Sequence, residues 1–223
     1  MQADPSPHIY KMSYDSLLAK LSDKSISQSL ITMFSEVFQP LTESAPLNRL
    51  TERKFAQKYG AQLLNLIQRS SSLLKTRISG GKADVLLGLI KRALTCMQKI
   101  KHEDLYECSY SYIVRLIECK RYKSVVHESE SLLVLIEYMD TPKVKMLELN
   151  TLIAKSNALL QGETVSISEL ETVYDLIAKR GRKIIGSVVF PRDLHNSLNN
   201  VYLSSFKLLF KVGKLLDLSL IHI

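Results

Sequence analysis

The sequence has no tryptophan and is poor in glycine and proline. Eight glycines and six prolines in 223 residues leave long stretches without a residue that favours tight turns. This scarcity favours long, uninterrupted elements. Hydrophobic residues make up 46% of the chain and charged residues 23%, which is the composition of an ordinary folded protein. A chain of this length and composition can bury a sizeable core.

Paired cysteines and long apolar runs are also missing. The three cysteines, Cys96, Cys108 and Cys119, have no CxxC spacing, a pattern typical of free thiols in a reducing compartment. The opening residues, MQADPSPHIYKMSYDS, contain no apolar segment of the kind found in secretory signals. No window approaches 18 apolar residues without a charge, so we expect no membrane-spanning helix and no membrane partner. We expect a protein of the cytoplasm, the nucleus or both.

The charge of the chain is strongly positive. The formal net charge is +8 at pH 7. A basic surface is compatible with nucleic acid, an anionic membrane surface or an acidic protein partner. It is also compatible with solubility alone, and the net charge does not choose among these.

Nearly every segment has the 3.6-residue hydrophobic period of an amphipathic helix. The predicted helices are Tyr14–Leu21, Ser25–Phe38, Leu50–Ile78, Asp84–Ile100, the stretch from KHEDL to Ile117, Arg121–Met139, Val144–Leu160, Glu169–Lys179 and Arg192–Leu216. Ile184–Phe190 is predicted to be a short helix or an extended connector. Three local signals set helix ends: Ser79–Gly81 closes one helix, Ser168 and Glu171 form a capping box, and Gly181 ends another helix.

These helices predict an all-α fold. Short loops between successive helices make antiparallel neighbours, and a succession of hairpins favours an irregular α-solenoid, or superhelix, over a closed bundle. The expected organisation is a flexible N-terminal arm over residues 1–13 and one helical-repeat domain over residues 14–217.

Residues 106–136 have the form of one tetratricopeptide-like (TPR-like) hairpin. Aromatic and aliphatic residues follow the first helix, a short basic turn contains Arg121 and Tyr122, and branched residues face back from the second helix. Lys120 and Val125 stand where that repeat often has glycine and alanine. The predicted core of the hairpin is Tyr106, Tyr110, Ile113, Ile117, Tyr122, Val125, Leu132 and Ile136.

This hairpin and the two helices before it resemble the N-terminal helical region of fungal separases. The resemblance covers residues 51–136 and rests on KFAQKYGAQLLNLIQRSSSLL, KADVLLGLIKRALTCMQKI and SYIVRLIECKRYKSVVHESESLLVLI. It is a pattern of helices and hydrophobic spacing and contains no catalytic signature. It implies a long chain whose helical solenoid binds the inhibitory chaperone securin and precedes a cysteine-protease domain that opens cohesin at anaphase.

No catalytic, cofactor-binding or metal-binding residue is expected in this chain. Cys108 and Cys119, with His102 and His127, have neither the paired spacing of a zinc site nor a glycine loop for an oxyanion hole. The segment ISGGKAD lacks the first glycine of a phosphate-binding loop and the hydroxyl after its lysine.

The densest basic cluster is KRGRK, and it is the candidate partner-binding site. Its cations are Lys179, Arg180, Arg182 and Lys183. They could bind an acidic peptide, nucleic acid or an import receptor. The plain alternative is a helix C-terminus with its usual cations and glycine.

The final residues, LSLIHI, match the translation of a mosaic-end adapter used in sequencing libraries. We therefore expect residues 218–223 to be read-through and the native chain to continue differently after about Asp217. On this expectation the sequence is a fragment of a longer protein.

The function predicted from the sequence is a non-catalytic protein-binding scaffold, resembling the N-terminal solenoid of separase. An extended, partly disordered partner such as securin would lie along a basic solenoid surface, and no small-molecule substrate is expected. One alternative is an unrelated TPR-like or HEAT-like adaptor in a cytoplasmic or nuclear complex. Another is a basic helical nucleic-acid-binding protein, whose affinity should fall steeply with added salt.

Overall fold

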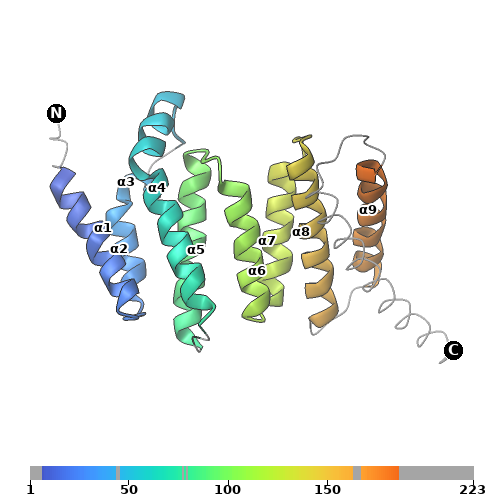
Figure 1. The fold of residues 1–223 in the computed structure, drawn as a ribbon, viewed down its shortest axis with the longest axis horizontal. Coiled ribbons are helices and arrows are strands. Elements are labelled where there is room, and N and C mark those ends of the chain that lie inside the picture. Colours follow the sequence, from blue (N-terminus) through green and yellow to red (C-terminus); the bar gives the residue numbers. More distant parts are fainter. Residues whose placement is uncertain (1–6, 44–45, 77, 79, 163–166, 186–223) are drawn as a thin grey trace. The chain divides into compact units, whose positions relative to one another are not determined.

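The computed structural model describes residues 7–43, 46–76, 78, 80–162 and 167–185. All regular structure in these residues is helical and none of it is strand, which confirms the all-α prediction (Figure 1). The chain divides into two compact units, residues 1–115 and residues 116–223, and the boundary falls inside one helix, α6. Each unit is described by itself.

The first unit is built around a long helical hairpin. It contains α1 (Pro7–Ser22), α2 (Ser29–Val37), α3 (Gln39–Thr42), α4 (Arg49–Leu74), α5 (Gly81–Lys99) and most of α6 (Leu105–Glu118). Helices α4 and α5 lie side by side and antiparallel, and they form the most extensive helix pair of this unit (Figure 1). Helices α2 and α3 pack on α5, while α1 packs on α2 and α4.

The core of the first unit joins aliphatic side chains of α4 and α5 to a small aromatic cluster. Leu63, Leu66, Leu89 and Ile90 are fully buried. The ring of Phe38 lies 4.7 Å from that of Phe34 and 5.8 Å from that of Tyr59, with Tyr14 at 6.3 Å, all between ring centroids. Burial of side chains this large supplies most of the free energy that holds the helices together, at about 1.5–3 kcal/mol each.

One glycine permits a close approach in this unit. Gly60, in the middle of α4, is buried, and a Cβ placed there would lie 2.9 Å from Cδ2 of His102. The imidazole of His102 is 13% exposed, and its Nδ1 accepts a hydrogen bond from the backbone N–H of Asp104 at 3.2 Å. The missing side chain at position 60 therefore makes room for the His102 ring.

The described residues of the second unit form the last turn of α6, then α7 (Tyr122–Ile136), α8 (Pro142–Gln161) and α9 (Ile167–Ile185). Helix α8 packs on both α7 and α9. Its sequence suits this central position, because apolar or small side chains occupy most of its circumference. The buried cluster comprises Met146, Leu149, Leu152, Ile153, Leu159, Leu170, Val173 and Ile177.

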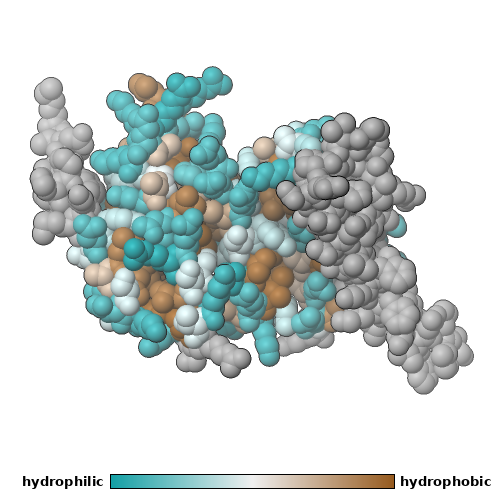
Figure 2. Space-filling model, in the orientation of Figure 1, coloured by the Kyte–Doolittle hydropathy of each residue, from teal (hydrophilic) through white to brown (hydrophobic). Residues whose placement is uncertain are grey.

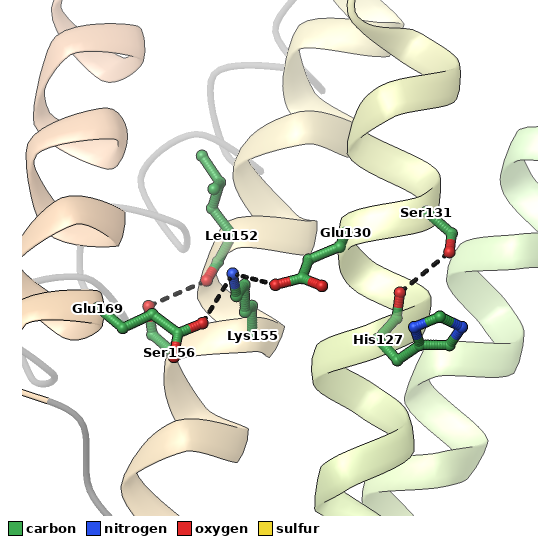
Figure 3. Close-up of polar contacts among 7 residues, drawn as sticks. All are labelled: His127, Glu130, Ser131, Leu152, Lys155, Ser156 and Glu169. Carbon is green, nitrogen blue, oxygen red and sulfur yellow. Dashed lines mark hydrogen bonds and ion pairs between the residues drawn. The ribbon is translucent and has the colours of Figure 1, made fainter.

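A buried lysine links α7, α8 and α9. The Nζ of Lys155, on α8, lies 2.8 Å from Glu130 Oε1 on α7 and 3.0 Å from Glu169 Oε1 on α9 (Figure 3). The Lys155 side chain is only 11% exposed. Two carboxylates from different helices therefore compensate one desolvated cation.

Three helices end in the same way, with a lysine where glycine is usual. Lys24, Lys101 and Lys120 have φ values of 54°, 50° and 56°, and they follow α1, α5 and α6. In each case the lysine N–H donates to the carbonyl three residues back, and the next N–H donates to the carbonyl five residues back. This is the Schellman motif, in which the left-handed residue is normally glycine because a Cβ is strained there.

Replacing Lys120 with glycine should therefore stabilise the protein. We expect a gain of about 1 kcal/mol in the free energy of unfolding, because the left-handed conformation no longer strains a Cβ. The measurement is urea denaturation followed by circular dichroism. The matched control is Lys54→Gly in the interior of α4, which should cost about 1 kcal/mol. A loss of stability from both substitutions would contradict a left-handed Lys120.

Several predicted helix boundaries were wrong for local reasons. The predicted flexible arm covers residues 1–13, but α1 already begins at Pro7, whose fixed φ suits a first helical position. Helix α4 ends at Leu74, where Thr76 Oγ1 donates to the carbonyl of Leu73, and not at Ser79–Gly81. Gly80, with φ of 50°, instead precedes α5, which begins at Gly81.

Two predicted signals in the second unit were also wrong. Helix α9 already includes Ile167, so Ser168 is not its N-cap, and the Ser168 carbonyl accepts from Thr172 Oγ1 at 2.9 Å. Gly181 does not end α9, which continues to Ile185, since one glycine inside a helix costs only about 1 kcal/mol. The predicted helix Arg192–Leu216 and the adapter-like residues 218–223 lie outside the described residues.

Candidate protein-binding surface

The positive charge of the chain is concentrated in the segment from Arg49 to Lys101. This segment, which includes α4 and α5, has only two acidic residues, Glu52 and Asp84. Its twelve cations are Arg49, Arg53, Lys54, Lys58, Arg69, Lys75, Arg77, Lys82, Lys91, Arg92, Lys99 and Lys101. The first unit therefore contains a larger excess of positive charge than the KRGRK cluster predicted as the binding site.

The first half of α4 presents three exposed cations and has a single acidic residue of its own. Arg53, Lys54 and Lys58 are exposed. The one acidic residue of α4, Glu52, has its Oε1 3.0 Å from Lys101 Nζ, so a cation of another segment already compensates it. Figure 2 shows hydrophilic side chains covering most of the end of α4 that extends beyond its neighbours.

The second half of α4 has an exposed polar face between two hollows. Gln68, Arg69 and Ser72 are exposed, and Gln68 and Ser72 line both hollows. The hollow next to α1 has a volume of about 370 Å³ and is mostly apolar in its lining, with Leu21 and Leu73 among its walls. We call Arg53, Lys54, Lys58, Gln68, Arg69 and Ser72 together the α4 surface.

Arg69 is held in place at the edge of the α1 hollow. Its Nε donates to Asn65 Oδ1 at 3.0 Å, and one terminal nitrogen donates to Ser22 Oγ on α1 at 3.3 Å. These contacts fix the guanidinium before any ligand arrives, which reduces the entropy cost of binding.

The hollow between α4 and α6 has a mixed charge. Its volume is about 400 Å³, and it contains the carboxylates of Asp104 and Glu107 as well as the cations Lys75 and Arg115. Hydroxyl groups of Ser71, Ser72 and Ser111 complete the polar wall. The hollow thus differs from the first half of α4, because it offers charges of both signs.

Two of the three cysteines, Cys96 and Cys108, do not have the surroundings of nucleophiles. Burial, with smaller contributions from Asp104 and Glu107, raises the pKa of the Cys108 thiol to about 11. Burial likewise raises the pKa of Cys96 to about 11, against the opposing effect of Lys99 and Arg92. Both therefore remain protonated near neutral pH, whereas a catalytic cysteine needs a thiolate. In the described parts of the chain, no three His, Cys, Asp or Glu side chains gather as metal ligands.

The structure describes the side chains of only two of the four cations of the predicted KRGRK site, Lys179 and Arg180. Lys179 is exposed, but the Nε of Arg180 lies 2.9 Å from Glu148 Oε1 in an ion pair that is not aligned as a hydrogen bond. The side chains of Arg182 and Lys183 lie outside the described residues. Because Glu148 already neutralises Arg180, the described half of this cluster is a weaker anion site than the sequence suggests.

The predicted hairpin core is only partly buried. Ile113, Val125, Leu132 and Ile136 are at most 3% exposed. Tyr106, Tyr110, Ile117 and Tyr122 are partly exposed instead. Tyrosine often has an apolar body inside and a polar tip at the surface, which accounts for three of these four.

Comparison with protein-family models, with curated proteins and with solved structures gives no match to this chain. Among the described helices, none is long and apolar enough to cross a membrane.

Proposed function

We propose that this chain is a non-catalytic protein-binding scaffold of successive helical hairpins, an irregular TPR-like solenoid. The packing within each unit supports this proposal. Helices adjacent in sequence pair with each other, α4 with α5 in the first unit and α7 with α8 and α8 with α9 in the second. Such nearest-neighbour packing is the pattern on which helical-repeat proteins are built.

The α4 surface is the observation that carries the binding function. It combines a cluster of exposed cations with polar side chains and two adjoining hollows, all within one unit. A helix face that contacts only water can mix charges of both signs. The excess of positive charge on this face instead suits a negatively charged ligand.

A protein partner fits this surface better than nucleic acid. Single-stranded nucleic acid is held by exposed aromatic rings between cations. Tyr59, beside Lys58, is 2% exposed. Phe55, beside Lys54, is partly buried and packs edge to face on Tyr59 at 5.7 Å between ring centroids, so neither ring lies open to a base. The partner we propose is an extended, acidic, securin-like chain, and the scaffold would belong to a separase-like protein active in the nucleus or cytoplasm.

The test is a binding titration with purified components. The securin of the source organism, labelled with a fluorophore, is titrated with the 223-residue chain, and anisotropy is measured. We expect saturable binding that weakens moderately with added salt. A single-stranded and a duplex oligonucleotide are titrated under the same conditions. Tighter binding of an oligonucleotide, with a steep salt dependence, would favour the nucleic-acid alternative. No binding of securin would leave the unrelated adaptor as the better proposal.

A further inference from the structure

The α4 surface has two halves of different chemistry, and this difference defines its ligand. From Arg53 to Ser72, at about 1.5 Å per residue, the surface extends for roughly 29 Å. The first half presents the cations Arg53, Lys54 and Lys58. The second half presents an amide, a hydroxyl and a single cation, Gln68, Ser72 and Arg69, beside the hollow of mixed charge between α4 and α6.

We propose that the α4 surface binds an extended partner segment of about nine residues that is acidic at one end and uncharged at the other. An extended chain advances about 3.3 Å per residue, so about nine residues match the length of the surface. This inference rests on the proposed scaffold function and assigns it a binding site and a ligand chemistry.

The acidic end of the segment binds at the first half of α4. Carboxylates there meet three exposed cations, while Glu52 is held by Lys101 at 3.0 Å. The attraction also orients the segment, since at the other end of the surface the cations Arg69, Lys75 and Arg115 are accompanied by the carboxylates of Asp104 and Glu107.

The uncharged end of the segment binds beside Gln68 and Ser72. An amide and a hydroxyl can each donate and accept hydrogen bonds, which suits the N–H and C=O groups of an extended backbone. The mostly apolar hollow next to α1 can take one side chain of the segment, and Arg69 at its edge is already held by Asn65 and Ser22.

The α6 hollow argues against a ligand with uniform negative charge. Asp104 and Glu107 line it within reach of the second half of α4, and the cations Lys75 and Arg115 balance their charge. A nucleic acid carries a phosphate at every nucleotide, so it would gain little net attraction from this hollow and would place some phosphates near the two carboxylates. A segment with its charge at one end avoids that repulsion.

The experiment compares two probes on three proteins. The first probe is a labelled nine-residue peptide with four carboxylates in one half and serine and glycine in the other, synthesised in both orders. The second is an oligothymidylate of nine nucleotides.

The α4 variant is Arg53→Glu, Lys54→Glu and Lys58→Glu together. The control variant, Lys120→Glu, Lys123→Glu and Lys143→Glu, makes the same change of net charge at exposed positions of the second unit. Circular dichroism verifies that both variants keep the helical content of the wild type.

We expect one order of the peptide to bind the wild-type chain better than the other. The α4 variant should weaken that binding by about tenfold or more, and the control variant by no more than about threefold. Gln68→Ala with Ser72→Ala should weaken it by a few-fold and abolish the difference between the two orders. Equal losses in both triple variants, tighter binding of the oligothymidylate, or no peptide binding to the wild type would each overturn the inference.

Titrating the same proteins with securin separates this inference from the proposed function. If securin binds the wild type and both triple variants equally, the site assignment is wrong and the scaffold function stands. If securin does not bind the wild type, the separase-like function is wrong, and the peptide results alone decide the chemistry of the surface.

Discussion

Replacing Gly60 with alanine should destabilise the first unit by about 1 kcal/mol, although the same change stabilises an ordinary helix. Alanine in place of glycine inside a helix gains about 1 kcal/mol from backbone entropy. At position 60 the new Cβ would lie 2.9 Å from Cδ2 and 3.0 Å from Nε2 of His102. Forcing an extra carbon into a packed site costs about 1–3 kcal/mol, which outweighs the gain.

The imidazole of His102 cannot move aside freely. It is 13% exposed, and its Nδ1 accepts the Asp104 N–H at 3.2 Å. Rotating the ring away from α4 would break this hydrogen bond and leave the N–H at the start of α6 without its acceptor. The cost of the new Cβ therefore appears as lost stability and not as a harmless rotamer change.

The control is the same substitution in a His102→Ala background. With the ring removed, Gly60→Ala should stabilise the protein by about 1 kcal/mol, as in a free helix. The two substitutions should thus couple by about 2 kcal/mol in a double-mutant cycle measured by urea denaturation. If Gly60→Ala stabilises both backgrounds, the ring does not pack against α4 as described.

Removing both carboxylates around Lys155 should cost the second unit about 2 kcal/mol at pH 7. Breaking a buried ion pair typically costs 3–5 kcal/mol, because the remaining charge has lost its partner in a poorly solvated site. The expected loss is smaller here because the Glu130 and Glu169 side chains are 52% and 36% exposed, so water screens them. The variant is Glu130→Gln with Glu169→Gln, measured by urea denaturation.

The matched variant removes the cation instead. Lys155→Met keeps a long side chain among α7, α8 and α9 but removes the need to compensate a buried charge. We expect a change within about 1 kcal/mol in either direction, since replacing a buried ion pair by apolar groups is often neutral. A larger loss from Lys155→Met than from the double Glu→Gln variant would show that the ion pairs themselves stabilise the unit.

The pH dependence of this difference has a definite sign. Burial lowers the pKa of Lys155, but the bonds to Glu130 and Glu169 outweigh burial, and the net pKa lies above the ordinary 10.5. The wild-type contribution is therefore complete below pH 10.5 and is lost as the pH rises through the higher folded value. In the double Glu→Gln variant the two ion pairs are gone, so burial lowers the pKa of Lys155. The charged Lys155 then destabilises the folded variant, and this cost is relieved as the pH rises towards 10.5. The stability difference between the two proteins should shrink as the solution is made alkaline.

The positions of the helices could be predicted from the sequence because they follow from the periodicity of hydrophobic residues. The details of the helix ends could not, because they depend on single contacts. The 3.6-residue period of the hydrophobic residues predicts α4, α5, α7 and α8 within a few residues of their observed ranges. The glycine pair at positions 80 and 81 was misassigned, because glycine is as useful before a helix as after one. The ends of α6 and α7 on either side of Lys120 were predicted to within one residue, but the left-handed conformation of Lys120 was not, since it is typical of glycine.

The candidate binding site was predicted less well from the sequence than the helices were. A local scan for clustered cations found KRGRK, yet the structure pairs Arg180 with Glu148. A longer window over residues 49–101 would have found the larger excess of positive charge without any structure. The hollows beside α4 could not be predicted, because they depend on the distance between helices that are separated in sequence by loops.

The pairing of helices that follow each other in the chain has a consequence for synthesis on the ribosome. In the second unit, α8 meets its first partner as soon as it emerges, because α7 has just preceded it, and α9 then docks on α8. Contacts between sequence neighbours close short loops and form quickly. Since a nascent chain appears at roughly 5–20 residues per second, each hairpin has time to form before the next helix is made. The unit can therefore be assembled one helix at a time, and little apolar surface stays exposed until a distant segment has been synthesised.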